Sequence, residues 1–247
     1  MRGPGQADHG ETRRRPGERA GLLAEAVLAE ARTLCEREGI ERLTMRRLAD
    51  RLGVAPNALY SHFADKSALV DALMDSLLAD IEVPDAGHVG WRQGLLELMR
   101  STRRFLLAHA DLIPHFLSRP RRGPNAIRLG EETLIFLEHA GLKGEDAVEA
   151  LRILLIYTFG FAAQEAPRRA DPHPEFRRLE SEAAFGAARD RPVTRELARS
   201  LSEHPSDKTF ERGLCWLLDG IRAAAEGGPT GSRRSGDPPG GAPPVGQ

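Results

Sequence analysis

Apolar residues recur at three- and four-residue intervals along most of the chain, and this helical spacing is the feature that most constrains the fold. Leu23, Val27, Ala31 and Leu34 form one clear stripe. β-branched residues are scarce, and no run alternates apolar and polar side chains as a half-buried strand does. The sequence therefore predicts an all-α protein.

The two ends of the chain have a different composition. Residues 1–18 are polar and include three consecutive arginines, and residues 227–247 hold Gly, Pro and Ser with almost nothing apolar. Neither segment can bury enough surface to offset chain entropy, so we predict two disordered tails. Between them we predict an N-terminal domain over residues 19–66 and a C-terminal helical domain over residues 67–226.

Capping residues, glycines and prolines delimit the predicted helices. In the N-terminal region these cover residues 19–38, 45–52 and 55–63, and a fourth begins after Asp65 and ends before Pro84. The remaining predicted helices are residues 91–109, 124–139, 145–166, 175–188, 194–202 and 207–225. Residues 167–174 are rich in turn formers and are predicted to be a loop.

Charge and motif content exclude several classes of protein. The formal net charge is −1, so attraction to nucleic acid has to come from local clustering of basic residues. The longest apolar stretch, residues 153–163, is shorter than the about 20 residues that span a bilayer. With no secretory signal at the N-terminus, we expect a cytoplasmic protein. No phosphate-binding, serine-hydrolase or zinc-protease motif occurs, so we expect no enzyme activity, no cofactor and no metal.

Residues 43–63 carry the clearest functional pattern. Two short helical runs on either side of a glycine-containing turn are typical of a helix-turn-helix. Leu48 supplies the inner face of the first helix, and the small Ala49 lets the second helix cross close by. Gly53 permits the left-handed turn conformation, and Leu59 anchors the second helix from beneath. A plain helical hairpin with a solvated basic face is the alternative.

The outward residues of this segment suit double-stranded DNA. An α-helix fits the major groove, where each base pair presents a distinct edge, and the preceding helix crosses the phosphate backbone. Asn57 can read adenine, and Ala58 can touch a thymine methyl group. The residues that we expect to contact DNA are Thr44, Arg46, Arg47, Pro56, Asn57, Ala58, Tyr60, Ser61, His62 and Lys66.

The run LTMRRLADRLGVAPNALYSHFADKSALVDAL, preceded by EREGI, resembles the TetR family of transcriptional regulators. Residues 91–225 are similar to the tetracycline-repressor subgroup, through FLLAHAD and SRP near residues 105–120 and GLCWLLDGI at 213–221. The resemblance implies a homodimer with a three-helix DNA-binding head, a linking fourth helix and a helical ligand-binding body. Ala55 departs from the hydrogen-bonding helix cap that the family often has, at a cost of about 1 kcal/mol.

The helix predicted over residues 145–166 is apolar on nearly all sides and is expected to be buried all round. Together with residues 207–225 it can form an intersubunit four-helix bundle, with an internal core helix as the alternative. The resemblance favours the dimer, because paired half-sites need a two-fold protein. The residues expected at the dimer interface are Leu151, Leu155, Phe159, Phe210, Leu214, Leu217 and Ile221.

Aromatic and histidine side chains in the second region suggest a ligand cavity. The residues expected to line it are Met99, Phe105, His109, His115, Phe116, Phe136, Tyr157, Phe161 and Gln164. Plain core packing is the alternative for each apolar member of this set. A metal-chelate role for His109 and His115, as in the tetracycline-binding relatives, is a further alternative.

These features together predict a TetR-like repressor that binds a palindromic DNA operator and leaves it when a small-molecule effector binds. The effector would change the separation of the two recognition helices, which DNA requires to be about 34–36 Å apart. The competing hypothesis is a DNA-binding activator or architectural protein without an effector.

Overall fold

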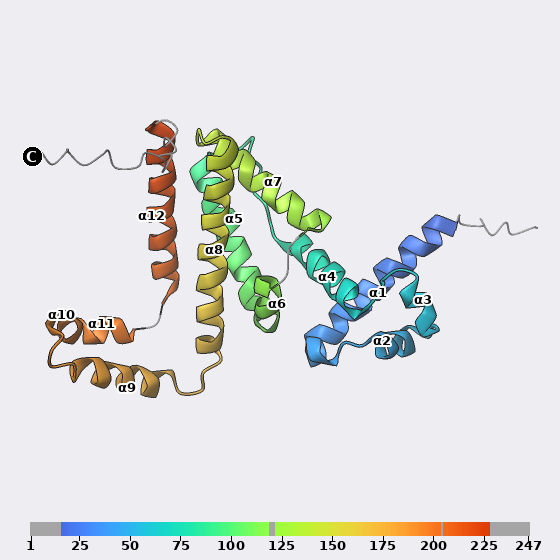
Figure 1. Ribbon diagram of the computed structural model, residues 1–247, viewed down its shortest axis with the longest axis horizontal. Helices are drawn as coiled ribbons and strands as arrows, with labels where there is room; N and C mark the ends of the chain where they lie inside the picture. Colours follow the sequence, from blue (N-terminus) through green and yellow to red (C-terminus); the bar gives the residue numbers. More distant parts are fainter. Residues whose placement is uncertain (1–15, 119–121, 204, 228–247) are drawn as a thin grey trace, which may run out of the picture. The chain divides into compact units, whose positions relative to one another are not determined.

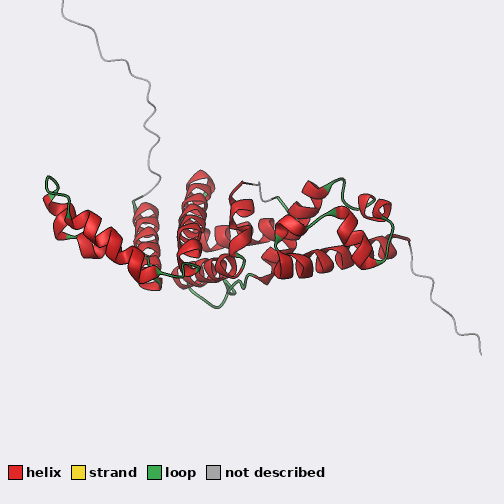
Figure 2. Cartoon of the chain, turned by 90° about the horizontal axis from the view of Figure 1, so that it is seen from below, coloured by secondary structure: helices red, strands yellow, loops and turns green. Residues whose placement is uncertain are grey.

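The computed structural model describes residues 16–118, 122–203 and 205–227, and all regular structure within those ranges is helical (Figure 2). This confirms the predicted all-α class. Apart from residues 16–18 and 227, the two predicted tails lie outside the described residues. Arg119 and Pro120 of the SRP run, on which part of the family resemblance rests, lie outside them as well. Within the described residues, no helix combines the length and the apolar character needed to cross a membrane.

Contacts between residues divide the chain into two compact units. The first unit consists of Met1–Glu82, Ser101–Gly130 and Ala162–Arg169. The second unit consists of Val83–Arg100, Glu131–Phe161 and Ala170–Gln247. Three helices, α5, α7 and α8, therefore contribute residues to both units. The domain boundary between residues 66 and 67 stays a prediction.

The helices are labelled in Figure 1. The N-terminal ones are α1 (Pro16–Glu38), α2 (Met45–Leu52), α3 (Pro56–Tyr60) and α4 (Lys66–Leu77), with short 3-10 turns at Ile40–Arg42 and Leu78–Asp80. The others are α5 (Trp91–Ala108), α6 (Ile113–Ser118, after a 3-10 turn at Ala110–Leu112), α7 (Pro124–His139), α8 (Gly144–Arg169), α9 (Pro174–Gly186), α10 (Pro192–Glu196), α11 (Ala198–Ser202) and α12 (Asp207–Glu226).

In the first unit α1 packs against both α2 and α4. Val27, Ala31 and Leu34 of the predicted stripe are completely buried, which confirms the inward face of α1. Leu48 of α2 and Leu73 of α4 are completely buried as well. The helix-turn-helix and the fourth helix therefore share one apolar core with α1, built from side chains that each contribute about 1.5–3 kcal/mol when buried.

In the second unit α8 and α12 run side by side in opposite directions (Figure 1). The Tyr157 hydroxyl of α8 donates a hydrogen bond of 2.8 Å to the carbonyl oxygen of Phe210. The two rings are stacked with their centroids 5.4 Å apart. A Cβ on Gly213 would lie 2.2 Å from the Tyr157 hydroxyl oxygen, so glycine at this position leaves room for the Tyr157 side chain against α12.

Several predicted boundaries are wrong, each for a local physical reason. Helix α1 begins three residues earlier than predicted, since Pro16 is compatible with the first turn of a helix. Helix α8 continues through Pro167, part of the predicted loop, and ends two residues later at Arg169, so that only the last turn follows the proline. The single helix predicted over residues 194–202 is two short helices that meet at Leu197, whose φ of −96° and ψ of 12° are not helical.

The burial predicted for α8 also requires correction. Ile156 is 72% exposed, and Ile153 and Val148 are exposed as well. One apolar face of α8 is therefore uncovered within this chain, and its apolar composition does not come from burial on all sides.

Candidate nucleic-acid interface and effector cavity

Helix α2 is framed by the cap and the turn that the sequence predicted. The Thr44 side chain accepts a hydrogen bond of 3.2 Å from the backbone N–H of Arg47, which satisfies one donor of the first turn. At the other end Gly53 has φ 66° and ψ 29°, a left-handed conformation in which an L side chain costs roughly 1–2 kcal/mol. These two residues determine where α2 begins and ends.

Helix α3 is short and rests on a single apolar anchor. Pro56 opens the helix, and Ala55 before it supplies no side-chain cap. Leu59 is completely buried, whereas the next residue, Tyr60, is half exposed. The helix thus presents its polar residues outward from a fixed base, as a recognition helix must.

The residues predicted to contact DNA lie at the surface of this motif to different degrees. Those that are exposed are Thr44, Arg46, Pro56, Asn57, Tyr60, Ser61 and Lys66. The half-buried ones are Arg47, Ala58 and His62.

The arginines of α2 differ in whether they form ion pairs. The guanidinium of Arg47 donates hydrogen bonds of 2.6 and 2.7 Å to the carboxylate of Glu38, and Arg51 pairs with Glu30. Arg46 forms no ion pair within the described ranges and is exposed. A phosphate approaching α2 would therefore have no carboxylate to displace from Arg46, whereas it would compete with Glu38 for Arg47.

Lys66 is the exposed first residue of α4. The helix is capped by Asp65, whose side chain accepts a hydrogen bond of 2.8 Å from the N–H of Ala68. This cap fixes the start of α4, where Lys66 is exposed.

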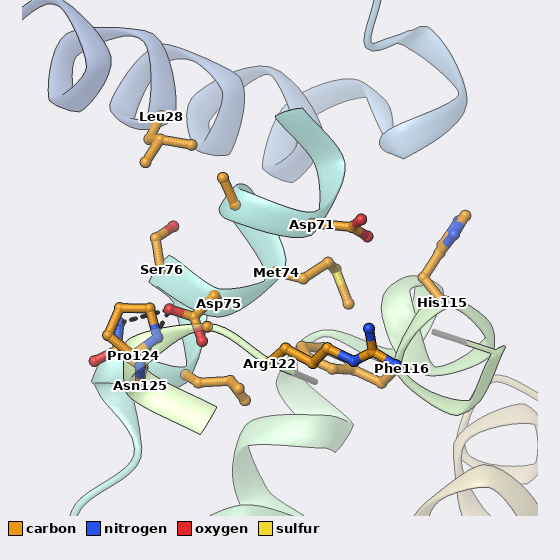
Figure 3. Close-up of a pocket in the computed structure, with 13 residues that line it drawn as sticks. Leu28, Asp71, Met74, Asp75, Ser76, His115, Phe116, Arg122, Pro124 and Asn125 are labelled. Atoms are coloured by element: carbon orange, nitrogen blue, oxygen red, sulfur yellow. Dashed lines mark hydrogen bonds between the residues drawn. The ribbon is translucent and has the colours of Figure 1, made fainter. Parts of the chain in front are cut away.

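A cavity of about 580 Å³ lies in the first unit between α1, α4, α6 and the start of α7 (Figure 3). Its volume is in the range of pockets that hold drug-sized molecules. The described residues that line it are Leu28, Asp71, Ala72, Met74, Asp75, Ser76, Leu78, His115, Phe116, Arg122, Gly123, Pro124 and Asn125.

At one end of this cavity Asp75 joins α4 to the start of α7 (Figure 3). Its carboxylate accepts hydrogen bonds from the backbone N–H groups of Asn125 and Ala126, at 3.2 and 2.9 Å, and from the Asn125 side chain at 3.2 Å. A Cβ on Gly123 would lie 2.1 Å from Cγ of Asp75, so glycine permits this approach. The carboxylate therefore caps α7 and ties it to α4.

Only two of the nine residues predicted to bind a ligand, His115 and Phe116, line this cavity. Phe105 packs between His109 and Phe116, at centroid distances of 4.6 and 5.6 Å. The Nδ1 atom of His109 lies 3.0 Å from the carbonyl oxygen of Phe105, and this contact orients the ring.

The other predicted ligand residues have different surroundings. Tyr157 and Phe161 pack with Phe210 in the second unit. Met99 contacts Thr158, with its sulfur 3.3 Å from the hydroxyl oxygen. Phe136 is completely buried against Gly94, and Gln164 is exposed. Met99 and Phe136 are buried in the core, as the core-packing alternative expects.

Sequence reasoning missed the cavity because it missed α6. The available signal was Pro114, which follows Ile113 and occupies the first turn of the helix, a position that proline favours. Without α6, nothing indicated that Leu28, Met74 or Arg122 faces a shared space.

Residues predicted at a dimer interface divide into two groups. Phe210, Leu214, Phe159 and Ile221 are buried within a single chain, so they have little or no surface left for a partner. Leu151, Leu155 and Leu217 are half buried. The large apolar side chains that α8 and α12 expose are instead Ile153, Ile156 and Trp216.

An exposed short helix on a buried apolar frame, entered through a cap and a glycine turn, defines a helix-turn-helix DNA-binding protein. Comparison with known proteins identifies the family. The model described as "Bacterial regulatory proteins, tetR family" matches residues 27–73, and "Tetracyclin repressor-like, C-terminal domain" matches residues 83–225. The chain belongs to the TetR family, and it is a DNA-binding transcriptional regulator and not an enzyme.

Individual relatives extend this likeness over most of the chain. The class A tetracycline repressor of transposon 1721 from Escherichia coli is 34% identical over 81% of this chain and 90% of its own length. ActR of Streptomyces coelicolor in complex with actinorhodin is 28% identical with a TM-score of 0.74, covering 82% of this chain and 97% of that one. BioQ bound to its double-stranded DNA operator is 26% identical with a TM-score of 0.56, covering 81% and 98%.

Proposed function

We propose that this protein is a repressor that binds a palindromic operator as a homodimer and is released when a small molecule enters its helical body. The observation that carries the proposal is the position of the cavity. It is lined by Leu28 of α1 and by six residues of α4 and the turn that follows it, and α1 also packs against α2 of the DNA-binding motif.

This arrangement supplies a physical route from ligand to DNA. A molecule in the cavity touches α1 and α4, so it can favour one arrangement of these helices over another. It shifts the equilibrium only by the difference between its affinities for the DNA-competent and the released states. Weakened operator binding follows if the ligand prefers a state in which the two recognition helices are no longer about 34–36 Å apart.

Relatives support both halves of the mechanism. ActR has been solved with actinorhodin bound, and BioQ has been solved on its double-stranded DNA operator. The cavity in this chain also favours an effector-responsive regulator over an activator or architectural protein without an effector.

The exposed apolar face of α8 and α12 supports the homodimer. Ile156 is 72% exposed and Trp216 is 68% exposed in the single chain, although both lie on well-formed helices. Two copies that bring these helices together would cover this face in a four-helix bundle.

Release is tested by titrating the full-length protein onto the DNA upstream of its own gene and following fluorescence anisotropy. We expect salt-dependent, sequence-specific binding with two chains per operator, which an effector reverses. Failure to bind there and to any DNA selected from a random pool would contradict the proposal.

Dimerisation is tested with Ile156→Glu and a matched control, Ile127→Glu. Ile127 lies on the part of α7 that belongs to the first unit and is 64% exposed, so it is a similarly exposed isoleucine on a different helix. We expect Ile156→Glu to sediment as a monomer and to lose operator affinity, whereas Ile127→Glu stays dimeric. Dimers of equal stability in both variants would exclude this face.

A further inference from the structure

The cavity between α1, α4 and α6 has a chemical character that narrows the class of effector, and this inference rests on the proposed function. Figure 3 shows a mostly apolar wall with polar groups gathered at its two ends. Each end has a different capacity to bind a ligand group.

The apolar wall suits a ring system. Leu28, Met74 and Phe116 face the space from three different helices (Figure 3). Thioether and aromatic side chains make favourable contacts with ring edges and faces. Phe116 is held in place by an edge-on contact with Phe105, with centroids 5.6 Å apart, so this part of the wall is preorganised.

The end formed by α7 has no free charge for a ligand. The Asp75 carboxylate already accepts three hydrogen bonds from Asn125 and Ala126. A cationic ligand group would have to share a carboxylate that caps a helix, and this competition weakens any such site.

The end nearer α6 carries the available cation. Arg122 is exposed, and within the described residues no carboxylate pairs with it. His115 at the same end has a ring nitrogen that can donate a hydrogen bond. Asp71 also lines the cavity, but it already interacts with another group of the protein.

We propose that the cavity takes an aromatic small molecule with one anionic group, a carboxylate or a sulfonate, whose rings lie against Met74 and Phe116 and whose charge pairs with Arg122. The fork of an arginine side chain matches such a group in two parallel hydrogen bonds.

Two fluorescent probes test the charge requirement on the full-length protein. 8-Anilinonaphthalene-1-sulfonate carries the ring system with a sulfonate, and N-phenyl-1-naphthylamine carries the same rings without it. We expect Arg122→Gln to raise the Kd of the sulfonate probe about tenfold, as loss of a charge-assisted hydrogen bond predicts. The Kd of the neutral probe should stay within about twofold of its original value. Arg195→Gln, an exposed arginine on α10, is the matched control and should change neither Kd.

Pocket-filling variants test the location. Ala72→Trp on α4 and Leu28→Trp on α1 place an indole in the cavity from two different helices, so either variant that keeps its helical circular dichroism is sufficient. We expect both probes to lose at least tenfold in affinity. Unchanged sulfonate binding in Arg122→Gln, equal weakening of both probes there, or unchanged binding in the filled cavity would each overturn the proposal.

Operator release is measured separately with the same sulfonate probe. If the probe binds with the expected dependence on Arg122 and yet leaves operator affinity unchanged, the ligand class stands and release through this cavity is excluded. If it binds and lowers operator affinity, both proposals are supported.

Discussion

A buried ion pair between α5 and α8 provides a quantitative test of how the first unit is stabilised. Arg103 and Glu165 have side chains that are only 9% and 7% exposed. The guanidinium donates two parallel hydrogen bonds of 2.8 Å to the carboxylate, which also accepts one of 2.8 Å from Arg169. Both residues belong to the first unit, on helices that run into the second.

Removing one partner of a buried pair costs about 3–5 kcal/mol, because the other charge stays in a poorly solvated place. We expect Glu165→Leu to lower the free energy of unfolding by this amount. Arg103→Met should cost less, since Glu165 keeps its contact with the half-exposed Arg169. The double variant should be more stable than Glu165→Leu, because neither buried charge is left behind.

Urea unfolding of each variant at 25 °C, followed by circular dichroism, gives the free energies, and the double-mutant cycle gives the coupling. Glu149→Gln is the matched control, because its pair with Arg152 has side chains 64% and 68% exposed and an N–O distance of 3.4 Å. Such a surface pair is worth about 0–1 kcal/mol. Single variants that each lose less than about 1 kcal/mol, or losses that simply add, would refute the argument that burial makes this pair strong.

Three further predictions concern single side chains. Arg46→Ala and Tyr60→Ala should weaken operator binding without changing the helical circular dichroism. Arg46→Ala should also reduce by about 1 the slope of the logarithm of the binding constant against the logarithm of the salt concentration. Unchanged affinity and slope would remove both residues from the interface. Gly53→Ala should destabilise the protein by roughly 1–2 kcal/mol in urea unfolding, through its φ of 66° alone, since a Cβ there has open space around it, and an unchanged midpoint would show that the turn relaxes freely. Burial raises the pKa of the Cys35 thiol to about 11, so a thiol reagent at pH 8 should modify the half-buried Cys215 first. The same pKa shift makes stability depend on pH: the unfolded thiol, with a pKa of about 8.5, ionises before the folded one, so the free energy of unfolding falls as the pH rises from 8.5 toward 11. Native Cys35 that reacts as fast as Cys215 would contradict the raised pKa.

Local chemistry explains which parts of the motif were predictable. Thr44, Gly53 and Asp65 act on backbone groups within three or four residues, through a cap, a left-handed turn and a second cap. No distant part of the chain is needed for these interactions, so their spacing in the sequence is sufficient evidence. The inward positions of Leu48 and Leu59 follow from the same helical period.

Predictions about which faces are covered had a weaker basis. Ile156 and Phe210 are both apolar residues on helices, yet one is 72% exposed and the other is completely buried. Periodicity shows that apolar side chains share a face of a helix, but not whether another helix covers that face. The buried environment expected for all of α8 was misjudged for this reason.

The sequence by itself determined the helical class, the helix-turn-helix and the family, because caps, turns and apolar spacing act over a few residues. Only the tertiary structure decided where a small molecule can enter. The cavity depends on Leu28, Met74 and Arg122, which are separated by dozens of residues and meet because α6 and the start of α7 close a space against α1 and α4. A contact of that kind is a property of packing between elements, and no spacing within one helix specifies it.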